Sequence, residues 1–172
     1  MTAINRFESF EEFWPFYLSE HTNANSRRLH FVGTSGWLAS LAASTVANPI
    51  GFSLAMAGFG LVMRDAMKKE KEGPAFKHVA AMVALPALAS PVLYPAGIVW
   101  AYGCAWAGHF LIEKNRPATF KQPVWSLFAD WKMWGQMLQG KLWAGDDPVE
   151  QLGLTNLDNT RSAPSMRAVA QA

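Results

Sequence analysis

Residues 20–34 read Glu-His-Thr-Asn-Ala-Asn-Ser-Arg-Arg-Leu-His-Phe-Val-Gly-Thr, a polar segment that leads directly into apolar sequence. It contains two of the four histidines and an arginine pair: His21, Arg27, Arg28 and His30. From Leu29 to Met63 the chain has no Asp, Glu, Lys or Arg. Imidazole and guanidinium groups at the start of a long uncharged segment indicate chemistry at a membrane surface.

The composition of the 172-residue chain also favours a membrane protein. Hydrophobic residues make up 51% and charged residues 16%, whereas about a quarter of the residues in a typical soluble domain are charged. The net charge of +2 is too small to indicate nucleic-acid binding. The single cysteine, Cys104, excludes an internal disulfide and a multi-cysteine zinc site. The eight tryptophans are typical of an interfacial aromatic belt or of packing.

Turn residues divide the apolar sequence into four predicted helices, at residues 29–47, 50–66, 79–94 and 96–113. The turns lie at 48–51 and 95–97, and residues 64–77 are predicted to form a solvated, charged connection. Glycine, alanine and serine are frequent in these segments, as close helix contact in lipid requires. The predicted fold is all-α: an integral membrane four-helix bundle of two helical hairpins with flanking amphipathic interfacial helices.

The basic residues predict how this bundle is oriented. Nearly all of them would lie on one side: Arg6, Arg27, Arg28, Arg64, Lys68, Lys69, Lys71, Lys77, Lys114, Arg116 and Lys121. The opposite side would have only the two uncharged turns. By the positive-inside rule, the termini, the central loop and any site at that level face the cytoplasm, across the inner or plasma membrane of a bacterium.

Amphipathic segments flank the four helices. Residues 6–18 place aromatic side chains at helical spacing, with Pro15 as a predicted kink. Residues 124–143 do the same with tryptophan and leucine, and Asp130 falls mostly away from that apolar face. Each segment either lies in the membrane interface or packs on the bundle. The predicted domains are a membrane-embedded helical domain, 1–143, and a flexible C-terminal tail, 144–172.

His109 and Glu113 are the second group of residues that could carry chemistry. They lie four residues apart at the end of the fourth predicted helix and therefore share a face of it. In the predicted topology they lie at the same membrane depth as His21 and His30. Neutral imidazole with a carboxylate suits Fe(II) or Zn(II).

The spacing of His21 and His30 sets a condition on this site. They are nine positions apart, so on one continuous helix they would point to nearly opposite faces. They meet only if the backbone breaks between them, and residues 22–26 are a suitable break, with Asn25 or Ser26 capping the next helix.

Other interpretations of these residues stay open on spacing alone. A histidine at a helix end is often a cap or an interfacial residue, Glu113 can pair with Lys114 or Arg116, and His78 is either interfacial or a further ligand. The alternative functions are a non-catalytic membrane scaffold or assembly protein and a zinc-dependent membrane hydrolase. The sequence has neither the repeated His-x-x-His-His boxes of desaturases nor the Gly-x-Ser-x-Gly of serine hydrolases.

Three motifs carry a resemblance: Glu20-His21, Arg28-x-His30-Phe-x-Gly33 and Gly108-His109-Phe-x-x-Glu113-Lys-x-Arg116-Pro117-Ala118. Over roughly residues 7 to 140, the chain resembles a family of small multi-span membrane proteins whose yeast member is a 2-hydroxy-palmitic acid dioxygenase of fatty-acid α-oxidation. The resemblance implies an Fe(II)-dependent membrane enzyme that uses O2 to shorten a 2-hydroxy fatty acid by one carbon, with histidines holding the iron.

On this basis we predict a role for each candidate residue. His21, His30 and His109 hold one Fe(II), and Glu113 is a ligand or supports one. Arg28 or Arg116 binds the substrate carboxylate by bidentate hydrogen bonds. The acyl tail lies among the Gly/Ala-rich helices and enters from the bilayer.

Overall fold

The computed structural model describes residues 7–154, except for the side chain of Lys71. Every regular element in that range is helical, so the all-α prediction is confirmed. The main helices are α1 (Phe10–Ser19), α2 (Ala24–Ala47), α3 (Pro49–Lys69), α4 (Phe76–Ala89), α5 (Leu93–Trp106), α6 (Pro123–Leu138) and α7 (Pro148–Gln151). Three short segments complete the fold: η1 (Glu70–Glu72), η2 (Ala107–Glu113), which is a π-helix, and η3 (Ala118–Phe120).

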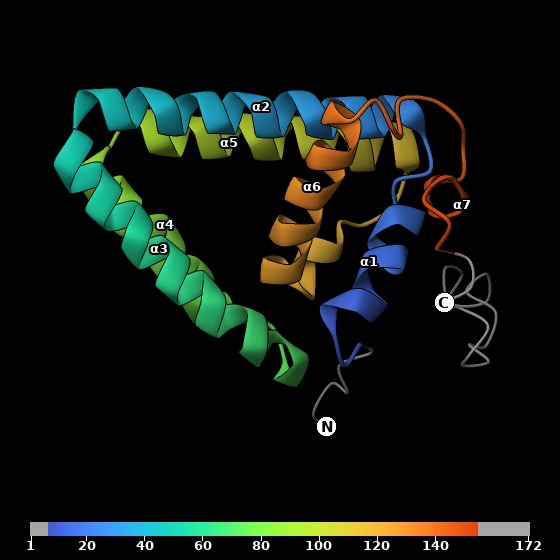
Figure 1. Ribbon diagram of the computed structural model, residues 1–172, viewed down its shortest axis with the longest axis horizontal. Coiled ribbons are helices and arrows are strands. Elements are labelled where there is room, and N and C mark those ends of the chain that lie inside the picture. Colours follow the sequence, from blue (N-terminus) through green and yellow to red (C-terminus); the bar gives the residue numbers. More distant parts are fainter. Residues whose placement is uncertain (1–6, 155–172) are drawn as a thin grey trace.

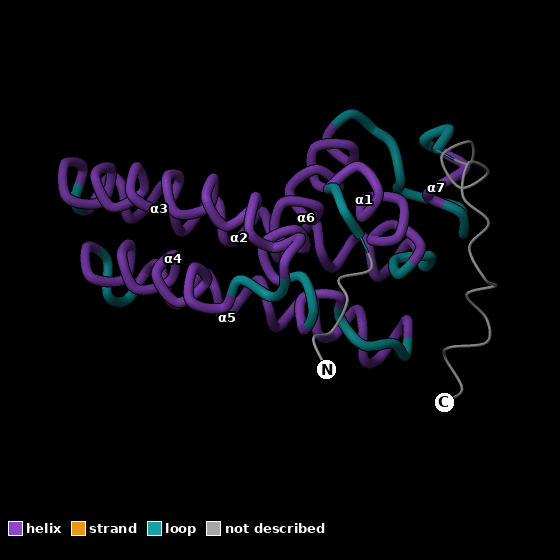
Figure 2. Tube along the Cα trace, turned by 90° about the horizontal axis from the view of Figure 1, so that it is seen from below, coloured by secondary structure: helices purple, strands orange, loops and turns teal. Residues whose placement is uncertain are grey.

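The four central helices form two antiparallel pairs, α2 beside α5 and α3 beside α4 (Figures 1 and 2). The chain runs along α2, turns sharply into α3 and returns through α4 and α5, so that the pairs meet at an apex. The predicted hairpins correspond to α2 with α3 and to α4 with α5. In the structure α2 packs mainly on α5, and α3 packs mainly on α4. The four-helix membrane bundle is therefore not established, although all four helices are present.

Hydrogen bonds at the apex join the turn between α2 and α3 to the turn between α4 and α5, and so support this pairing. The Asn48 side-chain amide donates to the Ala89 carbonyl over 3.1 Å. The hydroxyl groups of Ser44 and Ser90 are hydrogen-bonded at 2.8 Å. Asn48 also caps α3, since its side-chain oxygen accepts from the backbone N–H of Gly51.

The second bend lies earlier in the chain than the prediction of 95–97. Helix α4 ends at Ala89, and the next residues are Ser90 and Pro91. A proline disfavours helical geometry in the residue before it, so the helix ends there. Pro95 instead lies in the first turn of α5, where the missing N–H of proline has no helical partner to lose.

Small residues allow α2 and α5 to approach closely, as predicted. A Cβ atom added at Gly33 would lie 2.9 Å from the Cβ of Cys104 and 3.1 Å from the carbonyl oxygen of Ala101. Such distances are shorter than ordinary contacts, so this crossing requires glycine at position 33.

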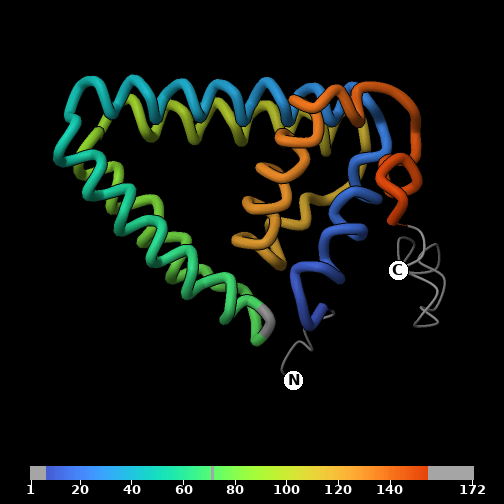
Figure 3. The backbone as a smooth tube through the Cα atoms, viewed as in Figure 1, coloured from blue at the N-terminus to red at the C-terminus, as the bar shows by residue number. Residues whose placement is uncertain are grey.

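Helices α1 and α6 lie against each other below the α2/α5 pair (Figure 3). Their shared core contains Phe13, Trp14, Trp125, Met133 and Met137, all buried. Trp14 and Trp125 therefore pack in the core and are not part of an interfacial aromatic belt.

The connection between α3 and α4 is less solvated than predicted for residues 64–77. Helix α3 continues to Lys69, and Glu70 after it is fully buried. The Glu70 carboxylate accepts the backbone N–H groups of Val124, at 2.9 Å, and of Trp125. It thus supplies the hydrogen-bond acceptors that the first turn of α6 needs.

One helix of those described, α3, is long and apolar enough to cross a membrane by length and composition. Of the predicted tail, residues 144–154 form α7 and its flanking turns, and residues 155–172 lie outside the described range. Pro148 at the start of α7 is buried, and α7 lies near α1 (Figure 1).

Candidate metal centre

Three buried histidines meet at one end of the α2/α5 pair. His21 lies in the turn before α2, His30 in the second turn of α2, and His109 in the π-helix η2. Each offers a ring nitrogen, and these three atoms all lie within 4.8 Å of one another. Bonds of about 2.0–2.1 Å to a shared metal bring such atoms to about 4 Å or less, so small ring rotations are enough.

The backbone break that brings His21 to His30 lies at residues 20–23, slightly before the predicted 22–26. The backbone N–H of His21 donates to the Leu18 carbonyl over 2.9 Å as α1 ends. The cap of α2 is Asn23, whose side chain accepts from the N–H of Asn25. Asn25 or Ser26 was predicted for this role. Asn23 takes it because α2 begins one residue later, at Ala24.

Each histidine is held through its Nδ1 atom. His21 Nδ1 lies 2.6 Å from the Tyr17 carbonyl, His30 Nδ1 lies 2.6 Å from Asp130 Oδ1, and His109 Nδ1 lies 2.8 Å from Asn115 Oδ1. Carbonyl and carboxylate oxygens only accept hydrogen bonds, so Nδ1 of His21 and of His30 carries the hydrogen. The lone pair is then on Nε2, the arrangement that histidine ligands of metals usually have.

The other ring nitrogens fit a metal ion. Nε2 of His21 and Nε2 of His30 are buried and have no hydrogen-bond partner among the described residues. Burial is the largest cause that lowers the pKa of His21 well below its ordinary value, and the neighbouring His30 and His109 lower this pKa further. His21 is therefore neutral at physiological pH, the form that binds metals.

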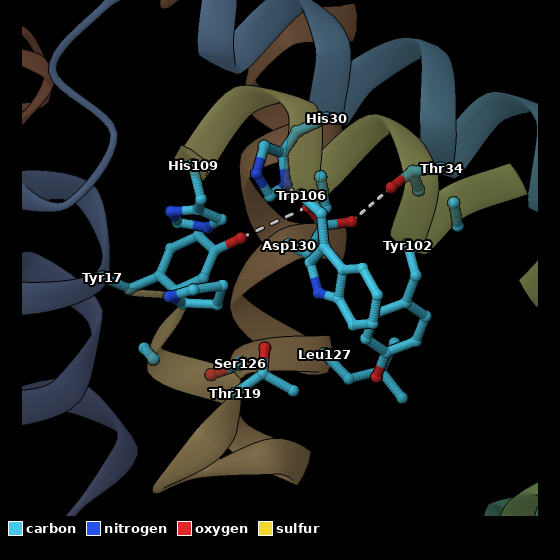
Figure 4. Close-up of a pocket in the computed structure, with 14 residues that line it drawn as sticks. Tyr17, His30, Thr34, Tyr102, Trp106, His109, Thr119, Ser126, Leu127 and Asp130 are labelled. Carbon is cyan, nitrogen blue, oxygen red and sulfur yellow. Dashed lines mark hydrogen bonds and ion pairs between the residues drawn. The ribbon is translucent and has the colours of Figure 1, made fainter. Parts of the chain in front are cut away.

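Asp130 is a central residue of the site that the sequence did not reveal. Its carboxylate accepts hydrogen bonds from the Tyr17 hydroxyl at 3.2 Å, from the Thr34 hydroxyl and from His30 (Figure 4). We predicted that Asp130 would lie on the polar face of its helix, but it points to the metal centre. The sequence carried no signal for this, because the burial of Ser126 and Met133, which share this helix face, is visible only in the structure.

Asn115 is the second residue that was missed. Its oxygen holds His109, and its amide nitrogen donates to the carbonyl of Glu20, at 2.9 Å, and to the Glu20 carboxylate, at 3.1 Å. Two of the motif segments, Glu20-His21 and the run after His109, are thereby connected. Glu20 was specified in a quoted motif, whereas Asn115 is an unspecified position between Lys114 and Arg116, so no sequence signal marked it.

Glu113 lies outside the histidine group. Its carboxylate accepts from the Thr22 hydroxyl at 3.1 Å and from the backbone N–H of Asn23 at 2.9 Å. The π-helical turn of η2 changes the α-helical geometry on which the shared face of His109 and Glu113 was predicted. In this position the side chain supports the start of α2.

The other predicted polar residues lie apart from the three histidines. Arg28 is exposed and donates to the Asn25 side chain and the Trp143 carbonyl, and Arg116 is exposed. His78 Nε2 lies 2.9 Å from the Asp65 carboxylate, so His78 is engaged at the α3/α4 pair. Substrate binding by either arginine stays a prediction.

Arg27 has a structural role rather than a place on a charged surface. It is fully buried, and its guanidinium donates to five backbone carbonyls: those of His21, Thr22, Leu142, Ala144 and Gly145. These bonds fasten the turn that carries His21 to the segment after α6. The predicted boundary between residues 143 and 144 falls within this hydrogen-bonded segment.

A cavity of about 80 Å³ adjoins the metal centre. His30 and His109 line one end of it, next to Asp130, and Figure 4 shows Tyr102 and Trp106 projecting from α5 along its side. The hydroxyl of Ser126 also lines it and is buried without a partner among the described residues. The site thus combines three ring nitrogens that could hold a metal ion with a small adjoining cavity.

A family model described as 2-hydroxy-palmitic acid dioxygenase Mpo1-like matches residues 7–142. The chain belongs to this Mpo1-like family. No curated protein and no solved structure matches the chain. The match confirms the resemblance inferred from the motifs, and it covers all three histidines, Asp130 and Asn115 of this Mpo1-like protein.

Proposed function

We propose that this protein is an Fe(II)-dependent membrane dioxygenase that shortens 2-hydroxy fatty acids by one carbon. The observation that carries the proposal is the group of three buried histidines beside a cavity, in which Nε2 of His21 and Nε2 of His30 have no hydrogen-bond partner among the described residues. The name of the family supports the substrate and the reaction class. Three neutral imidazoles leave coordination positions open, as a catalytic metal requires.

The proposed reaction balances without a further reductant. The bond between C1 and C2 of the 2-hydroxy acid breaks, and these two carbons give up four electrons to one O2. The products are the fatty acid one carbon shorter, CO2 and water. Bound Fe(II) would supply the redox centre and a Lewis acid for the hydroxyl and carboxylate oxygens of the substrate.

The residues around the metal would position the histidines and the substrate. Asp130 orients His30 and strengthens it as a ligand. Tyr17 and Thr34, which donate to the same carboxylate, hold Asp130 in place. Ser126 has a hydroxyl free to hydrogen-bond the head group in the cavity.

Membrane attachment is part of the proposal. At the apex of the two helix pairs, Val46, Ile50, Leu88 and Val92 are each more than two-thirds exposed, and Val46 and Leu88 reach 84%. Such large apolar side chains suit lipid better than water. The histidine site lies at the opposite end of α2, where we expect the cytoplasmic interface, in the inner or plasma membrane of a bacterium.

The test is metal and product analysis of detergent-purified protein loaded anaerobically with Fe(II). We expect one iron per chain, and O2-dependent conversion of 2-hydroxypalmitic acid to the acid one carbon shorter with release of CO2. Iron-loaded, folded protein that leaves a panel of 2-hydroxy acids unchanged would overturn the proposed reaction.

Substitution of single histidines tests the metal site. His30→Ala should lose bound iron and activity while the protein still inserts into membranes. His78→Ala is the matched control, because His78 is bound to Asp65 instead, and it should keep both. Glu113→Gln separates a ligand from a helix support: we expect retained iron and a less stable start of α2.

A zinc-dependent hydrolase is the second candidate, because three histidines without a carboxylate are also a catalytic zinc set. Metal analysis of protein purified without added metal distinguishes the two. Stoichiometric zinc together with hydrolytic activity that chelation removes would favour the hydrolase.

A further inference from the structure

The cavity at the metal centre continues into a second one that runs back along α5. The second cavity also measures about 80 Å³ and lies among α2, α3, α4, α5 and α6. The two share five lining residues: Thr34, Ala101, Tyr102, Leu127 and Asp130. They therefore meet at Asp130 and Tyr102, and together they form one elongated space with the histidines at one end.

The lining of the second cavity is apolar. Trp37 and Trp131 stack with ring centroids 5.3 Å apart, and Phe59, Met82 and Ile98 are among the other lining residues. The phenol of Tyr94 lines the cavity too, but its hydroxyl donates to the Met82 carbonyl and so presents no free polar group. Asp130, the one charged residue of this lining, is already bound to His30 and Thr34 at the junction.

The length of the combined space follows from α5 and η2. Residues of both cavities recur at helical spacing on one face: Tyr94, Ile98, Tyr102, Ala105 and His109. His109 lies fifteen positions after Tyr94, which corresponds to about 22 Å at the rise of an α-helix. One leaflet of a bilayer core, the length of a lipid tail, is about 15 Å. The space is long enough for a long acyl chain.

We propose that these joined cavities hold the acyl tail of the substrate, with its head group at the histidines and its methyl end towards Tyr94. This assignment rests on the proposed function for the head group. It predicts that the protein selects long unbranched acids, because each methylene group buried along α5 strengthens binding by roughly fourfold.

Narrowing the second cavity should weaken the binding of long 2-hydroxy acids and leave the binding of short ones nearly unchanged. Ile98→Trp places a large ring in it, whereas Val99→Trp makes the same kind of change at the next position of α5, which is 73% exposed. Val83→Trp is a second test, because Val83 lines the cavity from α4 and is 40% exposed, so it can accept a larger ring at little cost to folding.

The experiment measures displacement of a fluorescent fatty acid from iron-loaded protein by 2-hydroxyoctanoic and 2-hydroxypalmitic acids at one detergent concentration. Comparing each variant with the wild type for the same acid cancels partition into micelles. We expect Ile98→Trp and Val83→Trp to weaken binding of the long acid at least about tenfold and of the short acid less than about twofold. Val99→Trp should change neither.

The outcomes separate the two proposals. If folded Ile98→Trp and Val83→Trp bind both acids as the wild type does, or lose both equally, the tail site is wrong even where the wild type turns over substrate. If the chain-length effect appears but no 2-hydroxy acid is converted, the tail site stands and the proposed reaction falls.

Discussion

The carboxylate of Asp130 connects three elements of the protein at one point. It accepts from Tyr17 of α1 and from Thr34 and His30 of α2, and it comes from α6. A carboxylate on the outer nitrogen of a metal-binding histidine fixes the ring and raises its basicity. Asp130 also lines both cavities where they adjoin, so it would connect the proposed metal site with the proposed tail site.

We predict that Asp130→Asn lowers metal affinity by about 10–100-fold without unfolding the protein, because the amide removes the negative charge next to His30. The measurement is competition for metal with a chelator of known affinity, with circular dichroism as a check on folding. Asp65→Asn is the matched control: Asp65 also binds a histidine, His78, but lies at the α3/α4 pair. Equal metal affinity in Asp130→Asn and the wild type would contradict the role given to Asp130.

Close packing of α2 on α5 places His30 and His109 within reach of each other. We predict that Gly33→Ala destabilises the fold by about 1–3 kcal/mol, because the new Cβ would meet Cys104 and the Ala101 backbone. Gly60→Ala adds the same methyl group to α3, where nothing lies within 4 Å of it. That control should be neutral or more stable by up to about 1 kcal/mol.

Thermal unfolding in one detergent, followed by circular dichroism, compares these two glycine variants. A melting temperature of Gly33→Ala at or above that of Gly60→Ala would show that the α2/α5 contact is looser than the structure has it.

Helix α6 depends on Glu70 for its first turn, and this makes its stability depend on pH. Burial is the largest influence on Glu70 and raises its pKa from 4.5 to about 7, although the N–H groups of Val124, Trp125 and Ala75 oppose the change. Between pH 4.5 and 7 the unfolded chain has released this proton and the folded chain has kept it. The contribution of Glu70 to the free energy of unfolding is therefore fully present below pH 4.5 and is lost as the pH rises through about 7.

We predict that wild-type protein loses on the order of 3 kcal/mol of stability from this group between those pH values. Glu70→Gln carries no proton to lose, so its unfolding free energy should change less over the same range. Denaturant unfolding of both proteins at intervals from pH 5 to about 8 measures the difference. Parallel pH curves for the two proteins would exclude Glu70 as the titrating group.

The two helix pairs meet at the C-terminal end of α2 (Figure 1), where exposed apolar residues gather, and the candidate metal centre lies at the N-terminal end of α2. The bends at Asn48 and Ser90 lie side by side and are joined by hydrogen bonds, so they form one end of the molecule. The exposed apolar side chains at this apex are the surface that the proposed attachment places in lipid.

Labelling of single cysteines tests this arrangement in a Cys104→Ser background. We predict that Val46→Cys and Leu88→Cys in membranes react with a water-soluble maleimide at least about tenfold more slowly than exposed Lys121→Cys, because a thiol in lipid stays protonated. Detergent should remove the difference. Apex cysteines that react as fast as Lys121→Cys in intact membranes would contradict insertion, and labelling of Lys121→Cys from the periplasmic side would contradict the cytoplasmic site.

The sequence alone was sufficient for the helical class, for the charge-free segments that became α2 to α5, and for His21, His30 and His109. These follow from local properties: periodicity, turn residues and short motifs, each visible within a few neighbouring positions. The motifs also led to the family that the match over residues 7–142 confirms.

The pairing of α2 with α5 and the inward position of Asp130 needed the folded molecule. Asp130 lies 100 residues from His30, and Arg27 reaches carbonyls 115 to 118 residues away. Periodicity shows which face of a helix is apolar, but it does not show which helix that face will meet. A lone polar residue beside an apolar face looks the same whether it reaches water or a buried histidine. Only the crossing of the helices distinguishes the two, because it determines which distant partner is within hydrogen-bond distance.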